Sequence, residues 1–142
     1  MWYSNTLIII GRKDCLNVFL KKSKDSGINW RNQPNFKGKA RPFTFSGTYP
    51  PPKKIIRTGY IGNGCQWCID HWGTKWQPFN VNIKRYNEKV KITFETYSYP
   101  PLRWLAHVSK KYPMLYFILL YENQKNKKRG KIIYQPMLNL KK

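Results

Sequence analysis

Apolar residues recur along this chain with two periods, and each period predicts one kind of secondary structure. Residues 7–10 form a β-branched run that ends at Gly11, which predicts a central strand buried on both faces. In residues 14–22 the apolar side chains recur at helical spacing, and Asp14 can cap the first turn. We therefore expect a helix here that packs on a sheet.

Two later stretches predict β-hairpins. Residues 79–84 and 90–95 alternate apolar and polar side chains and are separated by a short polar turn. Residues 114–121 and 131–134 predict a second hairpin around the polar loop 122–130.

Two further helices precede these hairpins. Residues 64–72 predict a short helix that Gly73 ends, and Pro101 opens a helix that runs to about residue 112. An order in which helices alternate with hairpins suits an α+β fold, with an antiparallel sheet covered by helices on one face. At 17.0 kDa the chain fits a single domain over residues 1–142.

One long segment lacks a clear period. Residues 26–57 are rich in Gly, Pro, Asn and Lys, so we expect an irregular segment, in which 43–45 forms a short edge strand. No acidic residue occurs between Asp25 and Asp70, which makes this the most concentrated basic tract of the chain.

The net charge of the chain indicates the kind of partner that the protein binds. The chain has 27 Lys and Arg against six Asp and Glu, a formal net charge of +21. A domain of this size cannot bury so much charge, and its surface therefore attracts polyanions. Because 41% of the residues are hydrophobic and 16% aromatic, the chain is not a disordered basic tail.

The sequence predicts neither a membrane-spanning segment nor a disulfide framework. The longest apolar stretches, residues 7–10 and 114–121, are shorter than the roughly 20 residues of a membrane span. The first residues lack the pattern of a secretory signal, so we expect an intracellular protein with no membrane partner. The three cysteines are an odd set, and reduced thiols are expected.

Residues 67–76, with the sequence WCIDHWGTKW, are followed by an aromatic strand. This block resembles the signature of the YubB-type ferredoxin-like domain family, which occurs on conjugative plasmids and phages. The resemblance extends over most of the chain and implies a ferredoxin-like fold and a mobile-element origin. Together with the missing secretory signal, it leads us to expect a protein in the cytoplasm of a bacterial host. It transfers no catalytic residue. The strong positive charge and the basic segment 26–57 depart from the family pattern.

Cys65, Cys68 and His71 have a spacing that metal sites use. A closed zinc site needs four ligands, and only Cys15 and His107 could complete it. Packing of Cys68 in the core explains the pattern equally well, so we assign no metal and no cofactor.

Aromatic residues offer a second kind of candidate site. Trp72 and Trp76 flank Lys75 and could stack bases beside a phosphate, but we favour both as core residues that lock a helix to the sheet. The later strands also carry many rings, as RNA-recognition sheets do, and we expect some of Tyr97, Tyr99 and Tyr116 to be exposed. No RNP-like octamer is present.

The acidic residues are scattered over the predicted elements rather than clustered, so we expect no enzyme.

We predict a small basic phage or plasmid protein that binds DNA or RNA, mainly through the phosphate backbone. The alternative is an interaction protein that inhibits a host defence or nucleoprotein complex, as an anti-CRISPR-like inhibitor would, by occupying an acidic or nucleic-acid-binding surface. The candidate nucleic-acid-binding residues are Arg31, Lys37, Lys39, Arg41, Lys53, Lys54, Arg57, Lys75, Lys125, Lys127, Lys128, Arg129 and Lys131.

Overall fold

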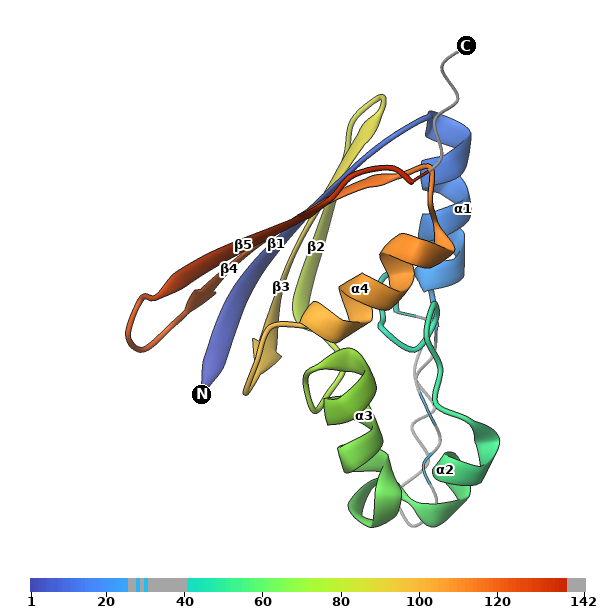
Figure 1. Cartoon of the computed structure of the whole chain (residues 1–142), viewed down its shortest axis with the longest axis vertical. Helices are drawn as coiled ribbons and strands as arrows, with labels where there is room; N and C mark the ends of the chain where they lie inside the picture. The colour runs from blue at the N-terminus through green and yellow to red at the C-terminus, as the bar shows by residue number, and fades with distance from the viewer. Residues whose placement is uncertain (26–27, 29, 31–40, 138–142) are drawn as a thin grey trace.

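The computed structural model describes residues 1–25, 28, 30 and 41–137. Within these residues, five antiparallel strands form one sheet with helices packed on one of its faces (Figure 1). The strands are β1 (Trp2–Ile10), β2 (Phe79–Arg85), β3 (Lys89–Tyr97), β4 (Tyr116–Asn123) and β5 (Arg129–Tyr134). The helices are α1 (Lys13–Ser23), α2 (Lys53–Thr58), α3 (Cys65–Trp72) and α4 (Leu102–Lys111), with a π-helical turn η1 (Tyr60–Gly64) before α3.

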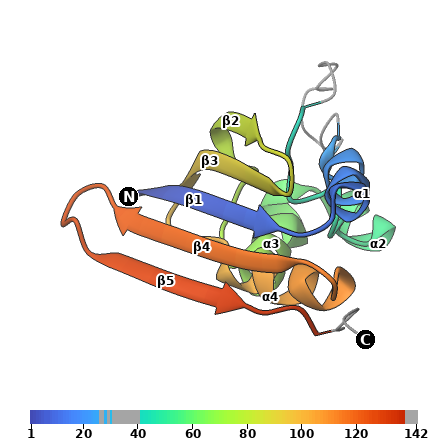
Figure 2. The same cartoon turned by 90° about the horizontal axis from the view of Figure 1, so that it is seen from above.

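The strand order is β2-β3-β1-β4-β5. Its first four strands follow the order of a ferredoxin-like βαββαβ unit, and β5 adds a fifth strand beside β4. Helices α1 and α4 cross the same face, while α2 and α3 extend beyond the end of the sheet (Figures 1 and 2). The expected α+β fold with an antiparallel sheet is confirmed.

The periodic segments form the elements that their patterns predict. Both hairpins and helix α4 lie within three residues of their expected bounds. Helix α3 ends at Gly73, whose φ of 86° and bonds from its N–H to the carbonyls of Cys68 and Ile69 (3.1 Å each) close the last turn.

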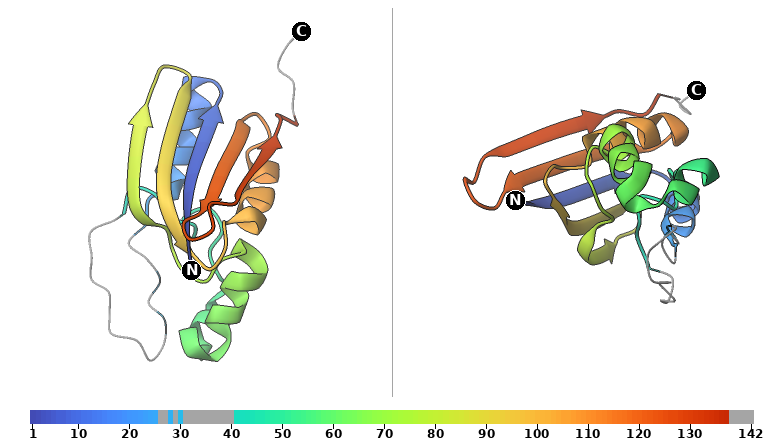
Figure 3. Two further views of the ribbon diagram at one scale, coloured as in Figure 1. Left: turned by 90° about the vertical axis from the view of Figure 1, so that its left-hand side faces the viewer. Right: turned by 90° about the horizontal axis from the view of Figure 1, so that it is seen from below.

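The prediction that strand β1 is buried on both faces is wrong, because only one of its faces is buried. Leu7 and Ile9 are fully buried under the helices, whereas Ile8 is half-buried and Ile10 is 38% exposed. The cause is the single helical layer, which leaves the opposite face of the sheet uncovered (Figure 3).

The expected edge strand at 43–45 is also wrong. This segment forms bends, and its backbone bonds to other elements: the Thr44 N–H donates to the Ser23 carbonyl (2.9 Å) and the Phe45 N–H to Gln77 Oε1 (2.8 Å). Phe43 and Phe45 are fully buried, because they fill the space between the sheet and helices α3 and α4 rather than extending its edge.

Two local details differ from the sequence expectations. Arg12, not Asp14, occupies the N-cap of α1, while Asp14 lies in the first turn and forms an ion pair with Arg12 (2.9 Å). Residues 53–58 are helical although 26–57 was expected to be irregular, since Pro52 at the N-cap has a φ of −62° that suits the start of a helix.

None of the helices in the described part of the chain is long and apolar enough to cross a membrane.

Gly47 provides a test of how tightly the 43–48 segment packs on α1. An added Cβ would lie 2.4 Å from the Lys22 carbonyl oxygen and 2.9 Å from the Ser23 carbonyl carbon, both backbone atoms that cannot move aside. We expect Gly47→Ala to lower the free energy of unfolding by about 1–3 kcal/mol in urea titrations. The matched control is Gly62→Ala, whose Cβ would meet only Thr58 at 3.4 Å. An equal loss in both variants would contradict the packing described here.

Candidate nucleic-acid interface

The helices leave one face of the sheet uncovered (Figure 3). The alternation of side chains along β2, β3 and β5 places lysines on this face. On β2, Val81 and Ile83 contact the core, so Lys84 points to the other side. On β3, Val90 and Ile92 are buried in the same way, which places Lys89 and Lys91 on the uncovered face.

Lys84 and Lys91 are direct cross-strand partners. Like charges in opposite positions on two strands repel each other and lower the stability of the pair. Two ion pairs join described residues, Arg12 with Asp14 and Arg129 with Glu122, and neither involves these lysines. This part of the face therefore carries lysines with which no carboxylate of the described residues forms an ion pair.

Lys84, Lys89 and Lys91 are not among the binding residues predicted from the sequence. The signal was present in the hairpin itself, because these lysines alternate with Val and Ile that face the core.

The β4–β5 loop and the start of β5 hold the predicted residues Lys125, Lys127, Lys128, Arg129 and Lys131, all of them exposed. The buried side chain of Asn123 orders the loop, since its Oδ1 accepts from the N–H groups of Lys125 (2.9 Å) and Asn126 (3.2 Å). Arg129 lies 3.8 Å from Glu122 but stays 80% exposed. The lysine and arginine side chains of the loop are thus exposed to solvent, while hydrogen bonds to Asn123 hold its backbone.

Helix α2 presents Lys53, Lys54 and Arg57, which are also exposed. Figures 1 and 2 place α2 and the β4–β5 loop on opposite sides of the molecule. The two basic segments are therefore separate surfaces. Three other predicted residues, Arg31, Lys37 and Lys39, lie outside the described residues.

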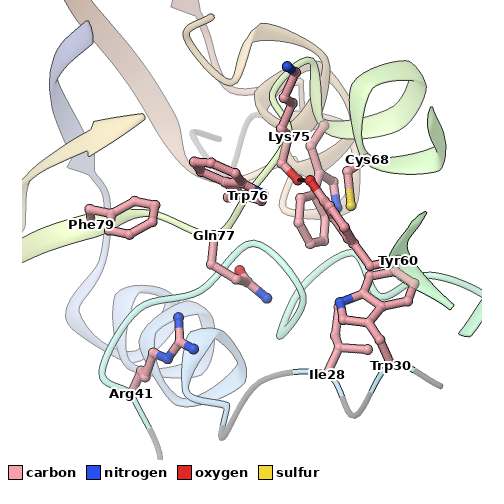
Figure 4. Close-up of a pocket in the computed structure, with 10 residues that line it drawn as sticks. Ile28, Trp30, Arg41, Tyr60, Cys68, Lys75, Trp76, Gln77 and Phe79 are labelled. Atoms are coloured by element: carbon pink, nitrogen blue, oxygen red, sulfur yellow. Dashed lines mark hydrogen bonds between the residues drawn. The ribbon is translucent and has the colours of Figure 1, made fainter. Parts of the chain in front are cut away.

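Arg41 and Lys75 both line a cavity of about 390 Å³ at the end of the sheet (Figure 4). Its other lining residues are Ile28, Trp30, Tyr60, Cys68, Trp72, Trp76, Gln77 and Phe79. Tyr60 donates its hydroxyl proton to the Lys75 carbonyl (2.9 Å), and burial holds the pKa of Tyr60 well above its ordinary value. The tyrosine stays protonated and fixes the backbone at Lys75.

The two tryptophans that flank Lys75 differ in burial. Trp72 is 1% exposed and donates its indole N–H to the Tyr49 carbonyl (2.8 Å), which confirms it as a core residue. Trp76 is 38% exposed, so the expectation that it belongs to the core is wrong. The chain leaves α3 at Gly73, and Trp76 then lies against the Tyr97 ring at the end of β3, with ring centroids 4.9 Å apart.

Trp76 belongs to a row of rings at this end of the sheet. Trp2 contacts Phe79 and Tyr97 edge to face, with centroids 5.1 and 5.2 Å apart, and Trp76 contacts Phe79 at 6.0 Å. The Gln124 N–H donates to the Trp2 carbonyl (2.9 Å), which joins the row to the β4–β5 loop. Lys75 completes it, with Nζ 5.5 Å from the centre of Tyr97.

The remaining strand aromatics divide between core and surface. Phe94 and Phe117 are buried, Tyr86 and Tyr99 are exposed, and Tyr97, Tyr116 and Tyr121 are half-buried. The middle of the uncovered face carries aliphatic and polar side chains, such as Ile8, Thr6 and Thr93, instead of rings. A central stacking surface like that of RNA-recognition sheets is therefore not formed by the described strands.

The weak metal candidates do not assemble into a site. Within the described residues, no three His, Cys, Asp or Glu side chains are grouped so that they could hold a metal ion. His71 stacks on Trp67 at 4.3 Å and contacts its carbonyl through Nδ1 (2.9 Å), while His107 stacks on Tyr49 at 3.6 Å. Both rings therefore serve in aromatic packing.

Cys68 allows the burial of this region to be measured. Burial raises the pKa of its thiol to about 12, with a further increase from neighbouring Cys65. At about pH 8 the folded protein holds far less thiolate at Cys68 than the unfolded chain does. We expect iodoacetamide to modify half-buried Cys65 in the native protein and Cys68 only in urea, as read by peptide mass spectrometry. Equal native rates at the two cysteines would show that solvent reaches Cys68.

No protein-family model and no curated protein matches the chain. Among solved structures, it is similar to the crystal structure of a protein api92 from Yersinia pseudotuberculosis, of the family DUF1281. The TM-score is 0.73 at 10% sequence identity, over 96% of this chain and 94% of that one. A likeness at this identity concerns the fold, and the chain shares with that protein a compact α+β architecture.

Proposed function

We propose that this protein binds nucleic acid, mainly through the phosphate backbone and without catalysis, on the uncovered face of the sheet and the adjoining β4–β5 loop. The observation that supports this most directly is the Lys84–Lys91 pair, in which two cations lie opposite each other on a face without a helical cover.

A like-charge pair of this kind costs stability in the free protein. A phosphate group between the two ammonium groups would remove the repulsion and make two charge-assisted hydrogen bonds. Each phosphate neutralised in this way also releases counterions, which drives association and makes it sensitive to salt. Lys89, Lys131 and the lysines of the β4–β5 loop add phosphate contacts along the same side of the molecule.

Such contacts position a nucleic acid without reading its sequence. The proposed activity is therefore binding that tolerates many sequences and falls steeply with salt. Helix α2 and the basic residues Arg31, Lys37 and Lys39 remain proposed as a second contact region. The resemblance of residues 67–76 to a plasmid and phage family supports action inside a bacterial host.

A second function is favoured by the apolar side chains on the same face. Ile10, Leu120 and Ile133 are 38%, 39% and 41% exposed. Lys89 lies opposite Ile10, and Lys131 lies opposite Leu120. This composition suits an acidic protein or nucleoprotein partner, including a component of a host defence system that the protein would inhibit. Leu120→Ser would then abolish binding to that partner, whereas nucleic-acid binding, which depends on charge, would be retained.

The salt dependence of binding tests the sheet face. In the variant Lys84→Gln/Lys91→Gln, two phosphate contacts are lost, so the slope of log affinity against log salt should fall in magnitude by about 1.4–1.8. Fluorescence anisotropy with a labelled oligonucleotide across a salt series measures this slope. The matched control, Lys21→Gln/Lys22→Gln, removes the same charge from α1 on the covered side and should leave the slope nearly unchanged. Equal changes in both variants would indicate a general charge effect and contradict a defined interface.

A triple variant tests helix α2 separately. If α2 contacts phosphate, Lys53→Gln/Lys54→Gln/Arg57→Gln should weaken binding strongly and lower the same slope by about 2 or more. The helix contributes no buried residue to the core, so the variant should unfold at the temperature of the unmodified protein. Unchanged affinity would remove α2 from the interface and leave the sheet face as the main site.

A further inference from the structure

We propose that the cavity beside Lys75 binds one unpaired base of a single-stranded nucleic acid. This inference rests on the proposed function and adds to it a site where a base, rather than the phosphate backbone, is held. Its volume of about 390 Å³ lies at the small end of the range for ligand pockets, which suits one nucleotide and not a longer segment.

The rings of the cavity come from separate parts of the chain. Trp30 and Tyr60 form one side, with centroids 5.6 Å apart, and Trp76 and Phe79 form the other (Figure 4). Trp76 and Phe79 are 38% and 40% exposed, a large fraction for rings of this size. A base inserted between the two sides would cover apolar surface that water now contacts, and stacking on an aromatic ring is tolerant of base identity.

Trp76 is held in place before any ligand arrives. One side of its ring stacks on Tyr97 with an interplanar angle of 27°, and Tyr97 in turn contacts Trp2. A ring that is already packed loses little rotamer freedom when a ligand stacks on it. The packed position of Trp76 therefore favours stacking of a base on it, because a mobile surface ring would lose more rotamer freedom on binding.

Polar groups of two kinds accompany the rings. Gln77 accepts from the Phe45 N–H through Oε1 (2.8 Å) and donates one Nε2 hydrogen to Ser46 Oγ (2.7 Å). Its second Nε2 hydrogen has no acceptor among the described residues and can donate to a carbonyl oxygen of a base. Lys75 supplies an ammonium group 5.5 Å from the centre of the Tyr97 ring, on which Trp76 stacks, and this group is suited to the phosphate that joins the bound base to its neighbour.

The chemistry of the cavity selects single strands over duplexes. In a duplex the faces of the bases are covered by their neighbours, so an aromatic pocket can reach them only after a base has left the stack. An unpaired strand offers a face at every base and a flexible backbone. A strand that follows β3 from Tyr97 would place one base in the cavity, pass Glu95, whose carboxylate accepts hydrogen bonds from Asn80 and Gln124, and bring its later phosphates to Lys91 and Lys89.

The experiment compares two probes of equal length and charge, an oligodeoxythymidylate and an abasic oligomer with the same backbone, at one salt concentration. We expect the unmodified full-length protein to bind the base-bearing strand about tenfold more tightly. Trp76→Leu, which keeps an apolar side chain but removes the stacking surface, should bring both probes to the affinity of the abasic strand. Phe79→Leu provides a second variant in case Trp76→Leu unfolds, as judged by its thermal transition.

Tyr86→Leu is the matched control. Tyr86 is 52% exposed and contacts Lys89 at 4.7 Å, but it lies in the β2–β3 turn at the opposite end of β3 from Tyr97. Both affinities should be unchanged in this variant. Equal binding of the two probes by the unmodified protein, or tighter binding of a duplex of the same length, would overturn the base pocket and leave phosphate binding intact. Failure to bind either probe would instead overturn the proposed function itself.

Discussion

The contact of Phe45 with its aromatic neighbours is the interaction on which the rest of the structure depends. Its ring lies 5.1 Å from Trp104 of α4, 5.6 Å from Trp72 of α3 and 5.9 Å from Phe94 of β3. One side chain thus links two helices to the sheet. Trp104 is fixed further, because its indole N–H donates to Thr48 Oγ1 (3.0 Å) in the same segment. Loss of a buried ring of this size costs about 3–5 kcal/mol, a large part of the stability of a domain.

The same segment sets the geometry of the cavity. The backbone N–H of Phe45 holds the Gln77 side chain, and Gln77 follows Trp76 directly in the chain. From the other side, Thr74 is buried and donates its hydroxyl to the Tyr97 carbonyl (2.7 Å). The short linker between α3 and β2 is therefore held at Thr74 and at Gln77, and the two residues between these points, Lys75 and Trp76, line the cavity. The segment that contains Phe45 therefore both packs the core and positions the side chains of the cavity.

Sequence periodicity predicted the elements whose burial is regular. The hairpins and α4 alternate or repeat over many residues, and each pattern has one structural solution. Residues 43–45 alternate as well, but both rings and Thr44 between them are buried, which a strand at the edge of a sheet cannot achieve. The pattern alone cannot distinguish these cases, because burial from all sides is decided by elements that are distant in sequence.

The residues of the candidate site also divide into those that the sequence predicts and those that only the structure reveals. Local charge runs in the β4–β5 loop and α2 were visible in the sequence, since they are contiguous. The Lys84–Lys91 pair was not, because it depends on the register of β2 against β3. Trp76 was assigned to the core together with Trp72, because both belong to the block that resembles a family signature, and the end of α3 at Gly73 separates their environments. Contacts between distant residues therefore had to come from the structure.

The distribution of the few acidic residues explains why the positive charge persists on the uncovered face. Asp14 pairs with Arg12, Asp70 accepts from Gln66 (2.8 Å), and Glu95 accepts from Asn80 (2.8 Å) and Gln124 (3.1 Å). These carboxylates have amide or arginine partners, and no ion pair within the described residues joins a carboxylate to the lysines of β2 and β3. A fold that needed neutrality for its stability would place an acid opposite Lys91, and β2 has Lys84 there instead. The repulsion is a cost in the free protein that the proposed polyanion would remove on binding, and the proposal therefore links the stability of the fold to polyanion affinity through the same two side chains.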